Sequence, residues 1–193
     1  STVENGLDTS TYSPEELKIV NTCALKNFIL HLQLQWSFWN DQNDLSSHAI
    51  STMDETLQPI SGFITNMEHR FIVALMACRQ LKQERPEKPQ QFESYVNNCL
   101  FKLKELSQLC PDTFEHKYLL LLAEKSHYQN APMEEVSARY EAAIESASQN
   151  DFLQYLALAN EYYGEYWLAK KRPHFARMYL QSALAMYFRW GCN

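Results

Sequence analysis

Apolar residues recur at intervals of three or four along most of the chain, which is the period of an amphipathic helix. Prolines punctuate this pattern. Because proline is tolerated in the first turn of a helix but breaks its interior, a periodic stretch that follows one predicts a new helix. The expected helices cover residues 14–40, 45–57, 59–82, 90–109, 111–129, 132–149, 152–170 and 173–189. The sequence therefore predicts an all-α protein of about eight helices.

Local signals mark where several of these helices begin and end. Residues 13–16 (Ser-Pro-Glu-Glu) form a capping box at the start of the first helix. Asp151 is placed to cap the seventh, and Gly191 to stop the last. Residues 82–89 hold five charges and two prolines, which is typical of a loop.

The last four predicted helices contain an internal repeat. A shift of 40 positions superimposes the apolar residues of the sixth helix on those of the eighth. The matched pairs are Val136 with Ala176, Tyr140 with Leu180, Ala143 with Ala183, Ile144 with Leu184, and Ala147 with Tyr187. Gly164 falls where a tetratricopeptide helix pair needs a small residue, so leucine there should destabilise by overpacking, while alanine should be mild or stabilising. The repeat favours stacked antiparallel helical hairpins, a tetratricopeptide-like α-solenoid, over an irregular bundle.

The predicted architecture has three parts. Residues 1–13 are expected to be disordered or extended, residues 14–110 to form N-terminal helical hairpins, and residues 111–193 to form two tetratricopeptide-like repeats. In the last part, Tyr163 and Trp167 are four residues apart and should face the partner helix as core.

Composition narrows the class of protein. With 46% apolar residues and only four glycines among 193, the chain can bury a core but is poor in the residues of tight hairpins and phosphate-binding loops. Its formal net charge of −6 gives no global attraction to nucleic acid or to an anionic membrane, so neither partner is expected. Five cysteines are an odd number, and no signal sequence or membrane-length apolar run is present, which favours a reducing, cytoplasmic location.

Several motifs follow one another in the second half of the chain. They are Cys-Pro-Asp-Thr-Phe-Glu-His-Lys-Tyr at 110–118, Ala-Glu at 123–124, Ala-Leu-Ala-Asn-Glu at 157–161 and Tyr-Phe-Arg-Trp-Gly at 187–191. In this order they resemble the helical segment of large bacterial and fungal signalling proteins. Those proteins combine a kinase-like N-terminal domain, an AAA-type ATPase and a sensor histidine kinase, often hybrid.

The resemblance extends over about residues 100–191, is thin over 45–99 and is absent from 1–44. The chain departs from the family pattern at Asp112 and Thr113, where the family has glutamate and asparagine. It departs again at Cys192 and Asn193, where the family has alanine and lysine. The resemblance implies a tetratricopeptide-like connector between the ATPase and the downstream sensor and kinase domains.

Catalytic and ligand-binding patterns are not found in the sequence. No two glycines are close enough for a phosphate-binding loop, no histidines or cysteines have zinc-site spacing, and none of the six histidines has the context of a phospho-accepting histidine in the family. We therefore expect no catalytic residue, cofactor or metal. His116 is interpreted as a helix-start histidine bonded to backbone, and Cys110 as a buried apolar packing residue, with a redox thiol as its alternative.

Candidate partner-binding residues lie on two surfaces. The first is the inner side of the first helix in each of the two repeats, and the second is the end of the last helix. They are Glu161, Tyr162 and Glu165, with Lys125 and Tyr128 one repeat earlier, and then Tyr187 and Trp190. An ordinary solvated face is the alternative for the first surface. Residues 170–193 hold five basic residues and no acidic one, which is typical of a solvated helix end or of a surface for an acidic partner.

Two functions remain open at this point. The first is a non-catalytic helical-repeat module of a cytoplasmic, two-component sensor histidine kinase, which contacts a protein partner or neighbouring domains. The second is a stand-alone tetratricopeptide-like adaptor that binds a peptide or partner protein. A homo-oligomer is left open in both.

Overall fold

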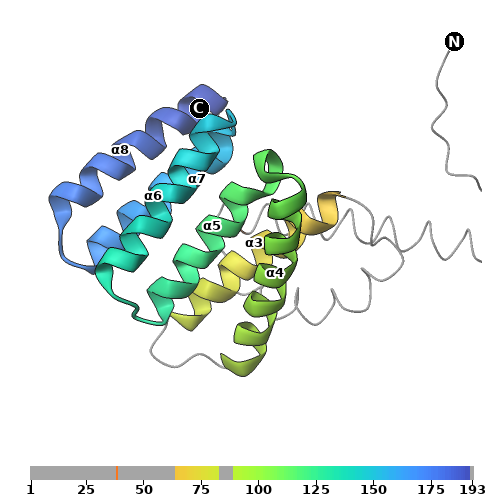
Figure 1. Ribbon diagram of the computed structural model, residues 1–193. Helices are drawn as coiled ribbons and strands as arrows, with labels where there is room; N and C mark the ends of the chain where they lie inside the picture. The colour runs from red at the N-terminus through yellow and green to blue at the C-terminus, as the bar shows by residue number, and fades with distance from the viewer. Residues whose placement is uncertain (1–37, 39–63, 83–88, 192–193) are drawn as a thin grey trace, which may run out of the picture. The chain divides into compact units, whose positions relative to one another are not determined.

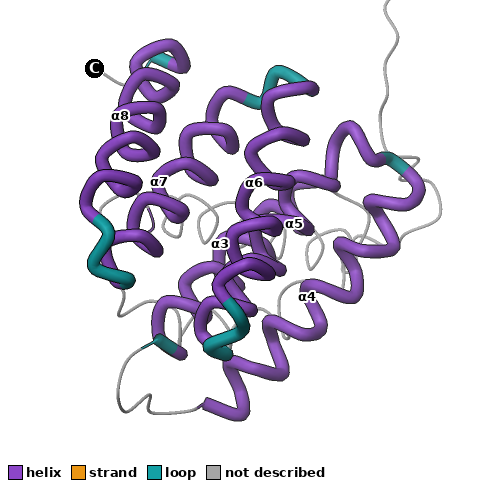
Figure 2. The backbone as a smooth tube through the Cα atoms, turned by 60° about the vertical axis from the view of Figure 1, so that its left-hand side comes forward, coloured by secondary structure: helices purple, strands orange, loops and turns teal. Residues whose placement is uncertain are grey.

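The computed structural model describes residue 38 and residues 64–82 and 89–191 (Figure 1). Every secondary-structure element in these ranges is a helix, which confirms the all-α prediction for them (Figure 2). The helices are α3 (Ile64–Leu81), α4 (Pro89–Leu109), α5 (Pro111–Tyr128), α6 (Met133–Gln149), α7 (Leu153–Ala169) and α8 (Pro173–Trp190). The segment expected at 1–13 and the helices expected at 14–40 and 45–57 lie outside the described residues, except that Phe38 is helical.

The chain divides into two compact units, Ser1–Val73 and Ala74–Asn193. In the first unit the described residues are Phe38 and the first half of α3, where Phe38 and Phe71 are buried. The second unit contains the end of α3 and all of α4–α8, and every contact discussed below belongs to it. The boundary expected at residue 110, between the N-terminal hairpins and the repeats, lies within the second unit and stays a prediction.

Helices α4 to α8 pack in chain order. Each packs against the next, and α5 also contacts α7 (Figure 1). Proline sets two of the starts as expected, because Pro111 and Pro173 each occupy the first turn of a helix. Gly191 stops α8 with a left-handed φ of 105°, also as expected.

The turns after α5, α6 and α7 share one geometry. Asn130, Asp151 and Lys171 each have a left-handed φ, between 54° and 57°. In each turn the next N–H donates to a carbonyl five residues back, as Ala131 does to Ser126 at 3.0 Å. This is the Schellman arrangement, which satisfies the last carbonyls of a helix.

The expected N-cap role of Asp151 is therefore wrong. Its left-handed backbone ends α6, and Phe152 takes the N-cap position of α7 without a side-chain capping bond.

The core between α7 and its neighbours is aromatic. Tyr163 stacks on Tyr140 of α6 at a centroid distance of 5.0 Å and contacts Tyr179 of α8 at 4.2 Å. Trp167 packs against Phe175 at 4.9 Å. Tyr163 and Trp167 are 1% and 9% exposed, so their predicted place in the core is confirmed.

Small residues allow α7 and α8 to approach closely. Ala176 and Ala183 are buried, and a Cβ added to Gly164 would lie 2.7 Å from Cγ of Leu180. Such a distance forces a shift in the neighbour. The need for a small residue at Gly164 is thus explained, but the prediction that alanine is mild or stabilising is not supported by this spacing.

Candidate functional site

The α7–α8 hairpin exposes an unusual amount of apolar side chain. Most of the described large apolar residues that are at least half exposed, or nearly so, lie on it. They are Leu168, Phe175, Met178, Leu184, Phe188 and Trp190. In a folded protein such a surface is typical of an interaction site.

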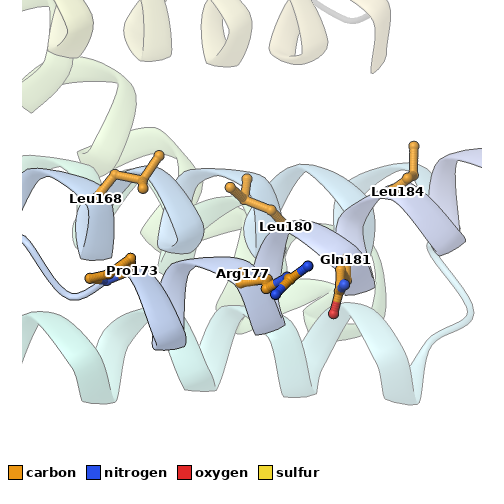
Figure 3. A pocket seen from close by; sticks show the side chains of 6 residues that line it. All are labelled: Leu168, Pro173, Arg177, Leu180, Gln181 and Leu184. Atoms are coloured by element: carbon orange, nitrogen blue, oxygen red, sulfur yellow. The ribbon is translucent and has the colours of Figure 1, made fainter.

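A hollow of about 360 Å³ lies along one flank of α8. Its lining residues are Leu168, Pro173, Arg177, Leu180, Gln181 and Leu184 (Figure 3). Three leucines project on the same side of the hairpin, and the side chains of Arg177 and Gln181 lie beside Leu180. The hollow thus combines an apolar floor with one cationic and one amide group.

The structure brings Tyr187 and Glu161 together. The Tyr187 hydroxyl donates a hydrogen bond to Oε2 of Glu161, so this pair links α8 to α7. Trp190 follows at the end of α8 and is 43% exposed. Of the sequence candidates, Trp190 is the one that presents most surface.

Glu165 and Tyr162 face the end of α3. Oε1 of Glu165 accepts from Nη2 of Arg79 at 3.3 Å. Burial raises the pKa of Glu165, and Arg79 and Lys82 oppose that rise. The Arg79 guanidinium and the Lys82 ammonium also lie 5.0 and 5.6 Å from the centre of the Tyr162 ring.

The expectation that Tyr162 lines an open groove is therefore wrong. Tyr162 is 1% exposed because the basic residues at the end of α3 cover its ring. Its hydroxyl is buried without a hydrogen-bond partner among the described residues, and burial raises its pKa well above the usual value.

Lys125 contacts α4, and Tyr128 lies near residues of both α3 and α4. Nζ of Lys125 donates to Oδ1 of Asn97 at 2.7 Å. The Tyr128 hydroxyl is buried and has no hydrogen-bond partner in the described part of the chain, and its pKa is raised by burial and then by Cys78 and Glu93. Lys125 therefore contacts α4, whereas Glu165 contacts the end of α3.

The helix ends explain this difference. The 40-residue shift fits α6 and α8, which begin at Met133 and Pro173, but α5 and α7 end at Tyr128 and Ala169, a shift of 41. The linker from α5 to α6 is one residue longer than the linker from α7 to α8. The residue equivalent to Glu165 is consequently Glu124, and not Lys125 as the 40-residue shift predicts.

Glu124 is the centre of a buried polar network that the sequence analysis did not single out. It is fully buried, and Oε2 accepts from Nζ of Lys82 at 2.9 Å. The Tyr140 hydroxyl donates to Oε1, and Nδ1 of His127 lies 3.5 Å from the same hydroxyl. Burial alone would lower the pKa of Lys82, but the Glu124 carboxylate outweighs this and raises it.

Sequence signals for this network existed. Glu124 directly follows the apolar run 118–123, where an ionised side chain requires a partner. Lys82, in contrast, stood in the stretch interpreted as a loop. With the register of 41, the two equivalent carboxylates Glu124 and Glu165 pair with two basic residues at the end of α3, Lys82 and Arg79.

His116 is held by aromatic rings. Its ring is 2% exposed, stacks on Phe152 at 4.5 Å and contacts Tyr155 at 4.9 Å. Neither ring nitrogen has a hydrogen-bond partner among the described residues, so the expected bond to backbone is wrong. Burial, followed by the Lys117 ammonium, lowers the pKa of His116 to about 3, which keeps it neutral.

Cys110 is exposed at the N-cap position of α5, so its expected burial is also wrong. The helix begins at the following proline, and the Cys110 side chain therefore lies outside the packed part of α5.

Within residues 64–82 and 89–191, no group of three or more His, Cys, Asp or Glu side chains is arranged to hold a metal ion. None of the described helices combines the length and the apolar character needed to cross a membrane. No family model, curated protein or solved structure matches this chain.

Proposed function

We propose that this chain is a non-catalytic helical-repeat module that binds protein and transmits the state of its neighbours. The observation that carries the proposal is the apolar surface of α8, which ends in the half-exposed Trp190. A ring of that size on an apolar surface is typical of the residues that dominate protein interfaces.

The proposed architecture is a tetratricopeptide-like solenoid of about eight helices, of which α5–α6 and α7–α8 are two repeats. Packing in chain order, the added contact between α5 and α7, and three turns of one geometry support it. Buried small residues at matching places, Ala143 and Ala183 above all, support it as well.

The proposed setting is a cytoplasmic two-component sensor histidine kinase, with the module connecting an ATPase to the downstream sensor and kinase domains. The motifs at 110–118, 123–124, 157–161 and 187–191 support this setting through their resemblance to that family. In this proposal the end of α8, with Tyr187 and Trp190, contacts a neighbouring domain or a protein partner, and no cofactor or nucleic acid takes part.

The coding sequence around these 193 residues tests the setting. ATPase motifs before the module and histidine-kinase motifs after it would support the connector. A coding sequence without either would contradict it and would leave the adaptor that binds a peptide or partner protein.

A variant tests the role of the α8 end in the intact protein. Trp190→Ala should change autophosphorylation at least about threefold, because it removes a central interface side chain, while the melting temperature of the isolated module stays within about 2 °C. Phe101→Ala, which removes a 63% exposed ring from α4, is the matched control and should leave signalling unchanged. Equal effects of the two variants, or unfolding of the module by Trp190→Ala, would contradict the proposal.

A further inference from the structure

The hollow on α8 is equivalent to a surface of α6 against which α7 packs. At the 40-residue shift of α6 and α8, four of its lining residues correspond to four residues of α6. The pairs are Ser137 with Arg177, Tyr140 with Leu180, Glu141 with Gln181, and Ile144 with Leu184. A fifth lining residue, Leu168, corresponds to His127 at the 41-residue shift of α5 and α7.

On the helix pair α5–α6, α7 packs against this surface. Tyr163 stacks on Tyr140 at a centroid distance of 5.0 Å, and its hydroxyl donates to Oε1 of Glu141 at 3.2 Å. Tyr166 lies 5.8 Å from Tyr140 and packs edge-on against His127 at 4.9 Å. Two residues of α7, three positions apart, therefore make the contacts with the surface.

On the helix pair α7–α8, the equivalent surface is exposed to solvent. Leu168 and Leu184 are 53% and 56% exposed, although the equivalent of Leu168, His127, packs against Tyr166 of α7. The polar residues have also changed in character. Glu141 accepts a hydrogen bond from a tyrosine, whereas Arg177 and Gln181 at the same edge of the hollow carry N–H donors.

The α8 side of the hollow is basic, whereas the nearby carboxylates of α7, Glu161 and Glu165, are bonded to Tyr187 and Arg79. Residues 170–191 contain Lys170, Lys171, Arg172, Arg177 and Arg189 and no acidic residue. A helix carrying a carboxylate where α7 carries Tyr163 would place it against Arg177 and Gln181. A large apolar residue three positions later would then meet Leu168 and Leu180, as Tyr166 meets His127 and Tyr140.

We propose that the hollow lined by Leu168, Arg177, Leu180, Gln181 and Leu184 is the docking site for an acidic amphipathic helix of a partner protein. The helix extends the α6–α7 type of interface by one step and carries a carboxylate at one position and a large apolar residue three positions later. This inference rests on the proposed protein-binding function and names the class of partner for the flank of α8.

The probes are two fluorescein-labelled 17-residue peptides with the sequence of α7, Leu153–Ala169, one with Tyr163→Glu and one with Tyr163→Lys. Fluorescence anisotropy with the 193-residue protein should show binding of both, with the glutamate peptide about fivefold tighter, the size expected when an exposed ion pair replaces a like-charge pair. Arg177→Glu in the protein should reverse the order of the two peptides.

Two further variants test the apolar part of the hollow. Leu184→Glu should weaken both peptides at least about fivefold, because it places a charge on the apolar floor. Met178→Glu is the matched control, since Met178 is 50% exposed on α8 but does not line the hollow, and it should change binding by less than about twofold. Because both sites are exposed, both variants should have the melting temperature of the wild-type protein.

Three results would overturn the proposal. They are absence of binding of both peptides, equal weakening by Leu184→Glu and Met178→Glu, and self-association of the protein that Leu184→Glu abolishes, since the occupant would then be a second copy. None of them depends on the genes that surround the coding sequence. A failed peptide experiment beside intact kinase motifs would remove this inference alone, and missing kinase motifs would remove the proposed setting alone.

Discussion

The two helix pairs α5–α6 and α7–α8 place equivalent residues in different environments. Glu124 is fully buried with Lys82 and Tyr140 on its two oxygens, while its equivalent, Glu165, has a 39% exposed side chain and meets Arg79. The helix α7 packs against the first pair, whereas no further helix follows the second pair in the described part of the chain. The environment of a residue in this molecule is thus set by what packs next as much as by its own helix.

The largest expected effect separates these two carboxylates. Glu124→Ala leaves the Lys82 ammonium and the Tyr140 hydroxyl without their buried partner and should lower the free energy of unfolding by about 3 kcal/mol. Glu165→Ala removes a half-exposed ion pair and should cost less than about 1 kcal/mol. Urea unfolding of the two variants measures both values, and equal losses would mean that covering by α7 does not decide the difference.

Acidification should destabilise the folded protein because His116 takes up a proton when the chain unfolds. Its pKa is about 3 in the folded protein and 6.5 when unfolded, so between these pH values the unfolded chain binds more protons. The free energy of unfolding should therefore fall as the pH drops from 6.5 towards 3, by up to about 1.4 kcal/mol per pH unit for this residue.

The variant His116→Leu tests the origin of this loss. Leucine keeps an apolar body against Phe152 and Tyr155 but binds no proton. Unfolding measured at pH 5 and pH 7 should therefore show a smaller difference for the variant than for the wild-type protein. An unchanged difference would assign the acid sensitivity to another group, for example His127, whose pKa burial lowers to about 4.

Enlarging the small residue Gly164 of the second pair should have an intermediate effect on the free energy of unfolding. Gly164 is equivalent to the buried Ala123, but a Cβ at Gly164 would lie 2.7 Å from Cγ of Leu180. Gly164→Ala should therefore cost about 1 kcal/mol despite its better helix propensity, and Gly164→Leu up to about 3 kcal/mol. Thermal unfolding of Gly164→Ala with Leu180→Ala should show a loss smaller than the sum of the two single losses, whereas additive losses would show that the two side chains do not clash.

The smallest expected effect compares the turns. Lys171 and Asn130 both have a left-handed backbone, which costs lysine more than asparagine. Lys171→Gly should raise the free energy of unfolding by about 0.5–1 kcal/mol, and Asn130→Gly by less. If lysine gains from a specific contact in its turn, Lys171→Gly would be neutral or destabilising in the same urea titration.

The helices were predictable from the sequence because the signals that define a helix lie within its own residues. Apolar spacing and the prolines at 111 and 173 place the boundaries of α4 to α8 within one residue of those observed, while the start predicted at residue 59 lies outside the described residues. The aromatic core around Tyr163 and Trp167 was predictable for the same reason, since four-residue spacing fixes a helix face.

The candidate site was less predictable because it depends on register and cover. One extra residue in the linker after α5 moves the equivalent of Glu165 from Lys125 to Glu124, and no periodic pattern reports such an insertion. The burial of Tyr162 depends on the end of α3, about 80 residues earlier in the chain. The exposure of α8 likewise follows from contacts between helices, which the pattern of one helix does not contain.

The packing of helices in chain order has a consequence for folding kinetics. Each hairpin can form from neighbouring segments with little loop-closure entropy, which favours rapid folding. The Arg79–Glu165 ion pair joins residues 86 positions apart and therefore depends on the hairpins being assembled first. An ion pair that forms after the folding barrier affects mainly the rate of unfolding. We therefore expect the contact between Arg79 and Glu165 to slow unfolding and to leave the folding rate nearly unchanged.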